Sequence, residues 1–187
     1  MTGLIEISFW TVEIALAIVW LLVRVTLCVR RHYVDWHREI LSLAMLVNVA
    51  IILRFTMFPF ALVDGKVQPL PFDASQAYPP RLNYVPFAEF LTYDSMHDTL
   101  INLIGNCAMF IPSGILLPIL YPRLDSFARV VGAGACMSIA IEIIQLPFHT
   151  RVSDVNDLLL NTLGVAIGYG VYALVKQLAR TSRTTGA

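Results

Sequence analysis

Charged residues are scarce in this chain: Asp, Glu, Lys and Arg together make up 14% of its 187 residues. Soluble domains carry about 25%, so this composition excludes an ordinary soluble fold. The formal net charge is zero, and no basic stretch stands out, which argues against a nucleic-acid partner. With 57% hydrophobic residues and a mean hydropathy of +0.70, the composition is typical of an integral membrane protein.

Cysteine and histidine are also few. The three cysteines, Cys28, Cys107 and Cys136, fall in or at the edge of apolar runs, without paired spacing or a nearby histidine cluster. We expect them to be small apolar residues. Only His149 lies near the polar residues discussed below, and no nucleophile stands beside a histidine base. The sequence therefore predicts no metal site and no cofactor.

Long apolar runs, in contrast, occupy most of the chain. A helix that crosses the hydrocarbon core of a bilayer needs about 20 residues. Five runs are long enough to cross it, namely 7–29, 40–63, 99–121, 130–147 and 155–178. The first is too long for a signal-peptide core and follows Glu6 rather than a positive charge, so we expect it to be retained. The sequence predicts an all-α integral membrane protein, a single domain over 1–187 with five transmembrane helices.

The distribution of Lys and Arg predicts how these helices cross the membrane. Residues 30–38 and the last turns before the C-terminus are basic, whereas 64–98 is rich in proline and poor in Lys and Arg. Because basic loops lie on the cytoplasmic side, we expect the N-terminus outside and the C-terminus inside. Residues 64–98 would then be an extracellular loop, in which 81–90 is amphipathic enough to lie on the membrane surface. Residues 179–187 would be a disordered cytoplasmic tail.

Three features within the runs predict local structure. Arg24 is expected to extend to the near interface together with Arg30 and Arg31. Small residues at helical spacing predict close approach of helix backbones: Gly132, Gly134 and Ser138 in the fourth run, and Gly164 and Gly168 in the fifth. Pro112 and Gly114 are expected to kink or soften the third run.

Polar residues interrupt the apolar runs within about two turns of their predicted outer ends, a depth of roughly 10 Å at ~1.5 Å per residue. Because a charge inside a bilayer costs several kcal/mol, such residues usually face a cavity, a partner or a ligand. We therefore predict a cavity that opens outward. The candidate site residues are Arg54, Asn102, Asn106, Glu142, Gln145, Arg151, Asp154, Asp157 and Asn161.

Structural roles remain open for several of these residues. Asp154 can cap the last helix, and the two asparagines of the third run can hydrogen-bond between helices. Arg54 can form an ion pair with Glu142, since each needs a partner in a low dielectric. Glu13, in the first run, can be that partner instead. Arg151 can be a solvated loop residue.

Three motifs resemble the VanZ-like family, which is named for a teicoplanin-resistance membrane protein. The first contains Asn83, Pro86 and Phe87, and the second Asn106, Phe110, Pro112 and Gly114. The third contains Glu142, Gln145, Arg151, Asp154, Asp157, Asn161 and Gly164. The resemblance covers roughly 54–170. It implies a small multi-pass protein of the bacterial plasma membrane. It also implies a lowered susceptibility to teicoplanin without an altered peptidoglycan precursor, and it brings no cofactor or catalytic residue.

Together, these observations favour a binding or protective membrane protein over an enzyme. Its ligand would be a lipid-linked or amphipathic envelope molecule, such as the lipid tail of a glycopeptide or a cell-wall precursor, and membrane lipids would be its other partners. Two alternatives stay open. An intramembrane enzyme would use Glu142 or Asp157 as acid or base, and a small transporter or flippase would use Glu142 as a proton-linked carboxylate.

Overall fold

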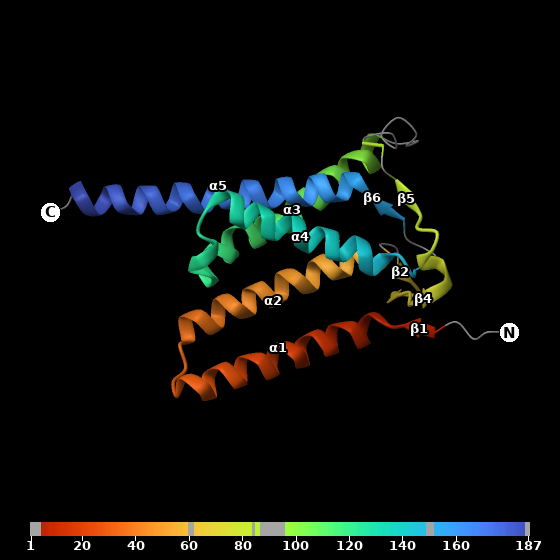
Figure 1. Ribbon diagram of the computed structural model, residues 1–187, viewed down its shortest axis with the longest axis horizontal. Coiled ribbons are helices and arrows are strands. Elements are labelled where there is room, and N and C mark those ends of the chain that lie inside the picture. Colours follow the sequence, from red (N-terminus) through yellow and green to blue (C-terminus); the bar gives the residue numbers. More distant parts are fainter. Residues whose placement is uncertain (1–4, 60–61, 84, 87–95, 149–151, 186–187) are drawn as a thin grey trace. The chain divides into compact units, whose positions relative to one another are not determined.

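Five long helices dominate the computed structural model, which describes residues 5–59, 62–83, 85–86, 96–148 and 152–185 (Figure 1). They are α1 (Phe9–Arg31), α2 (Trp36–Met57), α3 (Met96–Leu120), α4 (Phe127–Gln145) and α5 (Val155–Thr185). Within this described part of the chain, all five are long and apolar enough to cross a membrane. The predicted set of five spans agrees with these helices, while their direction across the membrane stays a prediction.

Local sequence explains where α1 and α2 meet. His32 follows α1 in the left-handed conformation, with φ of 59°, and its N–H donates to the carbonyl of Val29. Asp35 then caps α2, because its side chain accepts a hydrogen bond from the N–H of Arg38. α2 ends at Met57, six residues before the predicted boundary. The reason is Pro59, which favours an extended conformation for Phe58.

The C-terminal helix is longer than the sequence predicted. α5 continues to Thr185, so the prediction of a disordered tail is wrong over 179–185, and 186–187 lie outside the described residues. The segment contains neither Gly nor Pro before Gly186, and such residues are the ones that disfavour a helix most strongly. The hydroxyls of Thr181 and Ser182 donate to carbonyls one turn back, at Gln177 and Leu178.

The fold is mostly helical but not all-α as predicted, because it also contains short strands. Three two-stranded pairs form: antiparallel β1 (Ile5–Ile7) with β4 (Leu70–Phe72), antiparallel β2 (Leu62–Val63) with β3 (Lys66–Val67), and parallel β5 (Leu82–Asn83) with β6 (Ser153–Asp154). Two 3-10 turns, η1 (Ala74–Ala77) and η3 (Pro122–Leu124), complete the described elements. Strands of two or three residues are too short to show a period of two in the sequence.

The described chain forms two compact units. Unit 1 comprises 1–84 and 140–155, and unit 2 comprises 85–139 and 156–187. Unit 1 therefore contains α1, α2, all six short strands and the end of α4, whereas unit 2 contains α3 and most of α4 and α5. The prediction that the whole chain is one membrane domain stays a prediction.

Ring packing and an ion pair hold unit 1 together. Phe58 is buried and lies edge-on to Phe9, with ring centroids 5.4 Å apart. Between α1 and α2, the Arg24 guanidinium donates to both carboxylate oxygens of Glu39, with Nε at 2.7 Å from Oε2. Arg24 on α1 thus binds Glu39 on α2, a partner that the sequence did not predict. The bidentate pair neutralises the charge of the guanidinium between the two helices.

Glycine contacts bring α3 and α5 together in unit 2. A Cβ added to Gly164 would lie 2.1 Å from the Cys107 carbonyl oxygen, and one added to Gly168 would lie 2.1 Å from that of Ile111. The close approach predicted for these two glycines is confirmed. In α4, Gly134 contacts a neighbouring side chain, but Gly132 faces open space, so its predicted role in packing is wrong. α3 itself continues through the predicted kink site at Pro112.

Candidate functional site

The candidate polar residues that the structure describes fall into two groups together with some of their hydrogen-bond partners, one group in each unit. We call the group in unit 1 the strand cluster: Arg54, Arg81, Asn83, Glu142, Gln145, Ser153 and Asp154. We call the group in unit 2 the helix cluster: Asn106, Ser138, Asp157 and Asn161. Asn102 lies exposed on α3, and Arg151 lies outside the described residues. The single outward cavity predicted from the sequence stays a prediction.

Glu142 holds the segment that precedes α5. Its carboxylate Oε2 accepts a hydrogen bond from the backbone N–H of Asp154 at 3.0 Å. Its main-chain carbonyl accepts one from the Ser153 hydroxyl, also at 3.0 Å. This carbonyl belongs to the last turn of α4, where carbonyls lack partners within the helix. Glu142 therefore organises the chain around β6, and its predicted ion pair with Arg54 stays a prediction.

Asn83 is a partner that the sequence reasoning left out of the candidate set. It pairs with Asp154 in the register of β5 and β6, and its amide Nδ2 donates to Asp154 Oδ2 at 3.2 Å. Arg81 lies beside it: its guanidinium donates to the Phe148 carbonyl at 3.1 Å, and its own carbonyl accepts from Ser153 N–H. Because Asn83 is the first residue of the first family motif, that motif is the signal that could have added it to the candidate set.

Gln145 connects two helix ends in unit 1. Its side chain is 4% exposed, and Nε2 donates to the Thr56 carbonyl at 2.7 Å. Thr56 lies in the last turn of α2, so this hydrogen bond satisfies another helix-end carbonyl. Oε1 of Gln145 has no hydrogen-bond partner among the described residues. The amide thus has a clear structural role.

Arg54 contacts both backbone and aromatic rings. Its Nη1 donates to the Pro59 carbonyl at 3.0 Å. The guanidinium carbon also lies 5.8 Å from the ring centroid of Phe9 and 5.3 Å from that of Phe55, distances at which a cation is attracted to a ring face. One carboxylate oxygen of Glu13 is buried without a hydrogen-bond partner in the described part of the chain. The alternative pairing of Arg54 with Glu13 stays a prediction.

The helix cluster begins with a hydrogen bond between α3 and α5. Asn106 Nδ2 donates to Asp157 Oδ1 at 2.5 Å, and both side chains are half-buried. Asp157 lies in the first turn of α5, where the helix dipole favours a negative charge. Asn106 lies six residues inside the apolar span of α3, which begins at Leu100. The interhelical hydrogen bond left open for this asparagine is confirmed.

Asn161 and Ser138 are the most deeply buried members of the helix cluster. The Asn161 side chain is 1% exposed, and its Nδ2 donates to the hydroxyl of Ser138 on α4 at 3.0 Å. Its Oδ1 has no hydrogen-bond partner among the residues described. Ser138, noted in the sequence only for its size, is therefore also a polar partner. The prediction that Asn161 contacts a ligand stays a prediction.

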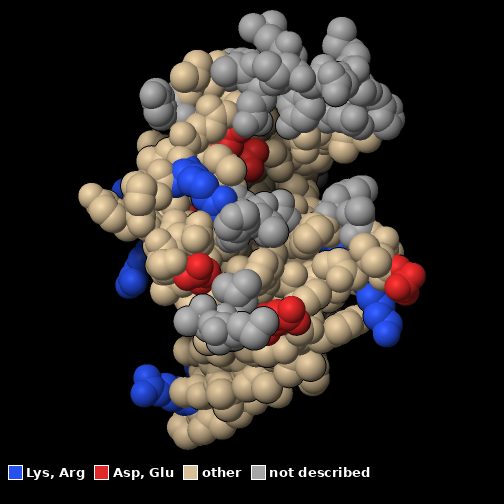
Figure 2. Space-filling view, turned by 90° about the vertical axis from the view of Figure 1, so that its right-hand side faces the viewer, with Lys and Arg blue, Asp and Glu red and all other residues tan. Residues whose placement is uncertain are grey.

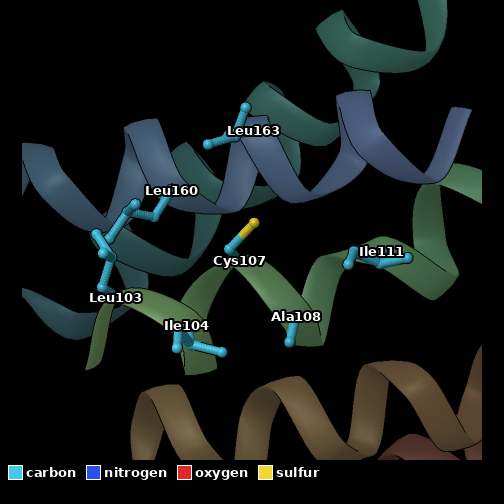
Figure 3. Close-up of a pocket in the computed structure, with 7 residues that line it drawn as sticks. All are labelled: Leu103, Ile104, Cys107, Ala108, Ile111, Leu160 and Leu163. Atoms are coloured by element: carbon cyan, nitrogen blue, oxygen red, sulfur yellow. The ribbon is translucent and has the colours of Figure 1, made fainter. Parts of the chain in front are cut away.

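An apolar groove lies beside the helix cluster on α3 and α5. Its volume is about 320 Å³, and we call it the α3–α5 groove. It is lined by Leu103, Ile104, Cys107, Ala108, Ile111, Leu160 and Leu163. In Figure 3, Leu103 and Leu160 lie close to one another, and the Cys107 thiol points toward α5. No charged side chain lines the groove. The face of the molecule drawn in Figure 2, in contrast, carries acidic and basic side chains scattered among uncharged residues.

The described part of the chain contains no candidate metal site. Among the described residues, no three His, Cys, Asp or Glu side chains lie close enough to hold an ion. The hydrogen-bonded carboxylates of both clusters instead accept from amides or backbone N–H groups. This arrangement is suited to holding polar groups in place.

Comparisons with known proteins agree with the motifs. The sequence pattern that defines the VanZ/LLP1 family matches residues 42–176 of the chain. Protein VanZ of Enterococcus faecium is 32% identical over 96 residues, which are 50% of this chain and 53% of that protein. The chain thus spans about half the length of this curated relative. No solved structure matches.

Proposed function

Because this chain belongs to the VanZ/LLP1 family, we propose that it binds an amphipathic or lipid-linked molecule of the cell envelope. It would do so from the outer side of the bacterial plasma membrane. The observation that carries the proposal is the hydrogen bond between Asn106 and Asp157 on two membrane-spanning helices. Asn106 lies six residues inside the apolar span of α3, and a polar side chain at such depth is costly unless a partner or ligand uses it.

The surroundings of this pair support binding rather than helix packing alone. α3 and α5 already approach closely through Gly164 and Gly168, and packing of this kind holds membrane helices together without polar side chains. Asn106 and Asp157 are half-buried, so part of each side chain stays accessible to a ligand. A rigid helix contact also keeps the amide and carboxylate in place before a ligand arrives, which reduces the entropy lost on binding.

The resemblance to VanZ-like proteins suggests what such binding does for the cell. A protein that retains a lipoglycopeptide at the membrane would lower susceptibility to teicoplanin without altering the cell-wall precursor. The lipid tail of such an antibiotic and the membrane-anchored end of a precursor share the same amphipathic chemistry. Either ligand would bring a polar group to the membrane surface and hydrocarbon into the bilayer.

Expression in a sensitive Gram-positive host tests this proposal. We expect wild type to reduce teicoplanin susceptibility and Asn106→Leu to lose the effect at an equal amount of protein in the membrane. The matched control is Gln177→Leu, an amide-to-leucine change at an exposed position of α5, which should protect as wild type does. If Asn106→Leu also protects fully, the pair does not belong to the binding site. If wild type has no effect, the link to glycopeptides is wrong.

The proposed orientation has its own test. In a protein whose three native cysteines are replaced, a cysteine at Gln76 should react with a membrane-impermeant thiol reagent added to intact cells. A cysteine at Arg31, in the basic turn after α1, should react only after the cells are opened. The reverse pattern would place the N-terminus inside and contradict a site that faces outward.

A further inference from the structure

The α3–α5 groove has an open rim and a buried floor. At the rim, Ile104 is 61% exposed and Leu163 is 50% exposed, whereas Leu160 below them is only 6% exposed. The floor also includes the half-buried Cys107, whose carbonyl is in contact with Gly164. Figure 3 shows these side chains along the two helices. The groove is thus a hollow in the helix surface that another molecule can enter.

The position of the groove restricts what can fill it. Its residues lie within the apolar spans Leu100–Leu120 and Val155–Ser182, so the surrounding solvent is hydrocarbon. Water needs polar partners in such a hollow, and all the lining side chains are apolar. Hydrocarbon, in contrast, gains contact with both walls at no desolvation cost. The occupant that fits these conditions is a chain of methylene groups.

The polar pair indicates which molecule would carry that chain. On α5, Asp157 lies one helical turn before Leu160, and on α3 Asn106 lies next to Cys107. Hydrocarbon in the groove would therefore continue toward a carboxylate and an amide. A carboxylate attracts a hydrogen-bond donor or a positive charge and repels a purely anionic headgroup. The adjoining surfaces thus complement an amphiphile with an amine-bearing head.

We infer that the α3–α5 groove is the subsite for one acyl chain of an amine-bearing amphiphile whose head lies at Asn106 and Asp157. This inference rests on the proposed function and specifies the ligand of the same site. The hydrogen-bonded pair selects the head, and the groove holds the tail.

Photo-crosslinking tests the tail subsite directly. The probe is phosphatidylethanolamine with a diazirine in one acyl chain, incorporated with the full-length protein into nanodiscs. After irradiation, peptide mass mapping should locate most adducts on 103–111 and 160–163. Ala108→Trp fills the groove, so adducts on these segments should fall about ten-fold, which corresponds to a loss of ~1.4 kcal/mol of binding. The control Ala128→Trp, at an exposed position of α4, should leave the yield unchanged.

A second pair of variants guards against a folding defect. If the melting temperature of Ala108→Trp falls below that of wild type, Leu163→Trp replaces it, with Leu174→Trp as its control. Both leucines are exposed on α5, but only Leu163 lines the groove. Adducts spread over the whole apolar surface in both members of a pair would overturn the inference, because they would indicate ordinary contact with bilayer lipid.

A separate crosslinking experiment tests the headgroup. The same diazirine tail on phosphatidylglycerol should give several-fold fewer adducts in the groove, and Asp157→Asn should abolish this difference. Equal labelling by the two lipids, or displacement of the probe by a polyprenyl phosphate but not by unlabelled phosphatidylethanolamine, would contradict an amine-bearing acyl ligand.

The outcomes separate this inference from the proposed function. Teicoplanin protection that depends on Asn106, without crosslinks in the groove, would leave the proposed function intact and the tail subsite wrong. Crosslinks that Ala108→Trp removes, without any protection by wild type, would support the subsite and contradict the glycopeptide role.

Discussion

Several polar residues of the strand cluster and of the helix cluster find their partners in different ways. In unit 1, Arg54, Arg81 and Gln145 donate to main-chain carbonyls near the ends of helices or in the segments between them. In unit 2, the hydrogen bonds of Asn106 and Asn161 join side chains on neighbouring helices. The first pattern accompanies short strands and helix ends, and the second accompanies continuous helices in close contact.

The reason for this difference lies in the backbone. A regular helix satisfies its own N–H and C=O groups, but a chain that leaves the helix near a membrane needs other partners for them. Polar residues in unit 1 supply those partners, so their presence is explained by structure. The hydrogen bond between Asn106 and Asp157 joins two side chains on different helices instead of satisfying a main-chain carbonyl, and the pair is therefore the better candidate for a functional site.

The ion pair of the helix hairpin gives the largest expected effect. Arg24→Leu would leave the carboxylate of Glu39 partly buried without its charged partner, and we expect a loss of roughly 3–5 kcal/mol in the free energy of unfolding. Denaturant unfolding of the purified protein in detergent measures this change. Exchange of the two residues, with Glu at 24 and Arg at 39, should restore part of the loss. A fully stable Arg24→Leu protein would show that unit 1 does not depend on the pair.

Close helix contact in unit 2 is tested at Gly164. Its substitution by alanine would place a methyl group against the Cys107 carbonyl, and overpacking of this kind typically costs about 1–3 kcal/mol. Gly170→Ala, on the same helix with nothing within 4 Å of the added atom, should be neutral or slightly stabilising. Thermal unfolding of both variants in the same detergent makes the comparison. Equal stabilities would mean that α3 and α5 do not need this contact.

Gln145 tests the claim that polar residues of unit 1 serve the backbone. Gln145→Leu removes the donor to the Thr56 carbonyl and leaves that acceptor buried, at an expected cost of about 1–3 kcal/mol. Gln177→Leu, at an exposed position on α5, should change the unfolding free energy far less. Should the two variants unfold alike, the hydrogen bond at the end of α2 contributes little.

A smaller effect is expected from pH at Asp125, in the turn between α3 and α4. The ammonium of Lys176 donates to this carboxylate and lowers its pKa from the ordinary value of 3.8. Since the folded pKa is lower than the unfolded one, the stabilisation is present above the unfolded value and is lost as pH falls through the folded one. Melting temperatures between pH 7 and pH 3 should show wild type losing its advantage over Asp125→Asn. A constant difference would contradict this linkage.

Much of the candidate site could be identified from the sequence, but its hydrogen-bond partners could not. Polar residues within apolar runs and three motifs identified Glu142, Asp154 and Asp157 as candidates, and the structure places each in a hydrogen bond. Asn83 is 71 residues from Asp154, and no local pattern relates positions that far apart. The register of two-residue strands brings them together, and such strands are invisible to periodicity.

The sequence by itself determined the class of protein and the spans of its helices. Transfer into a bilayer depends on the summed hydropathy of about 20 consecutive residues, which is a local property, so the runs around α1 to α5 could be recognised one at a time. Helix packing at Gly164 and Gly168 was likewise predictable from spacing within one helix. Only the tertiary structure decided that Arg24 pairs with Glu39 and that Asn161 pairs with Ser138. A hydrogen bond depends on which side chains of other segments come within about 3 Å, and that distance follows from the packing of whole helices.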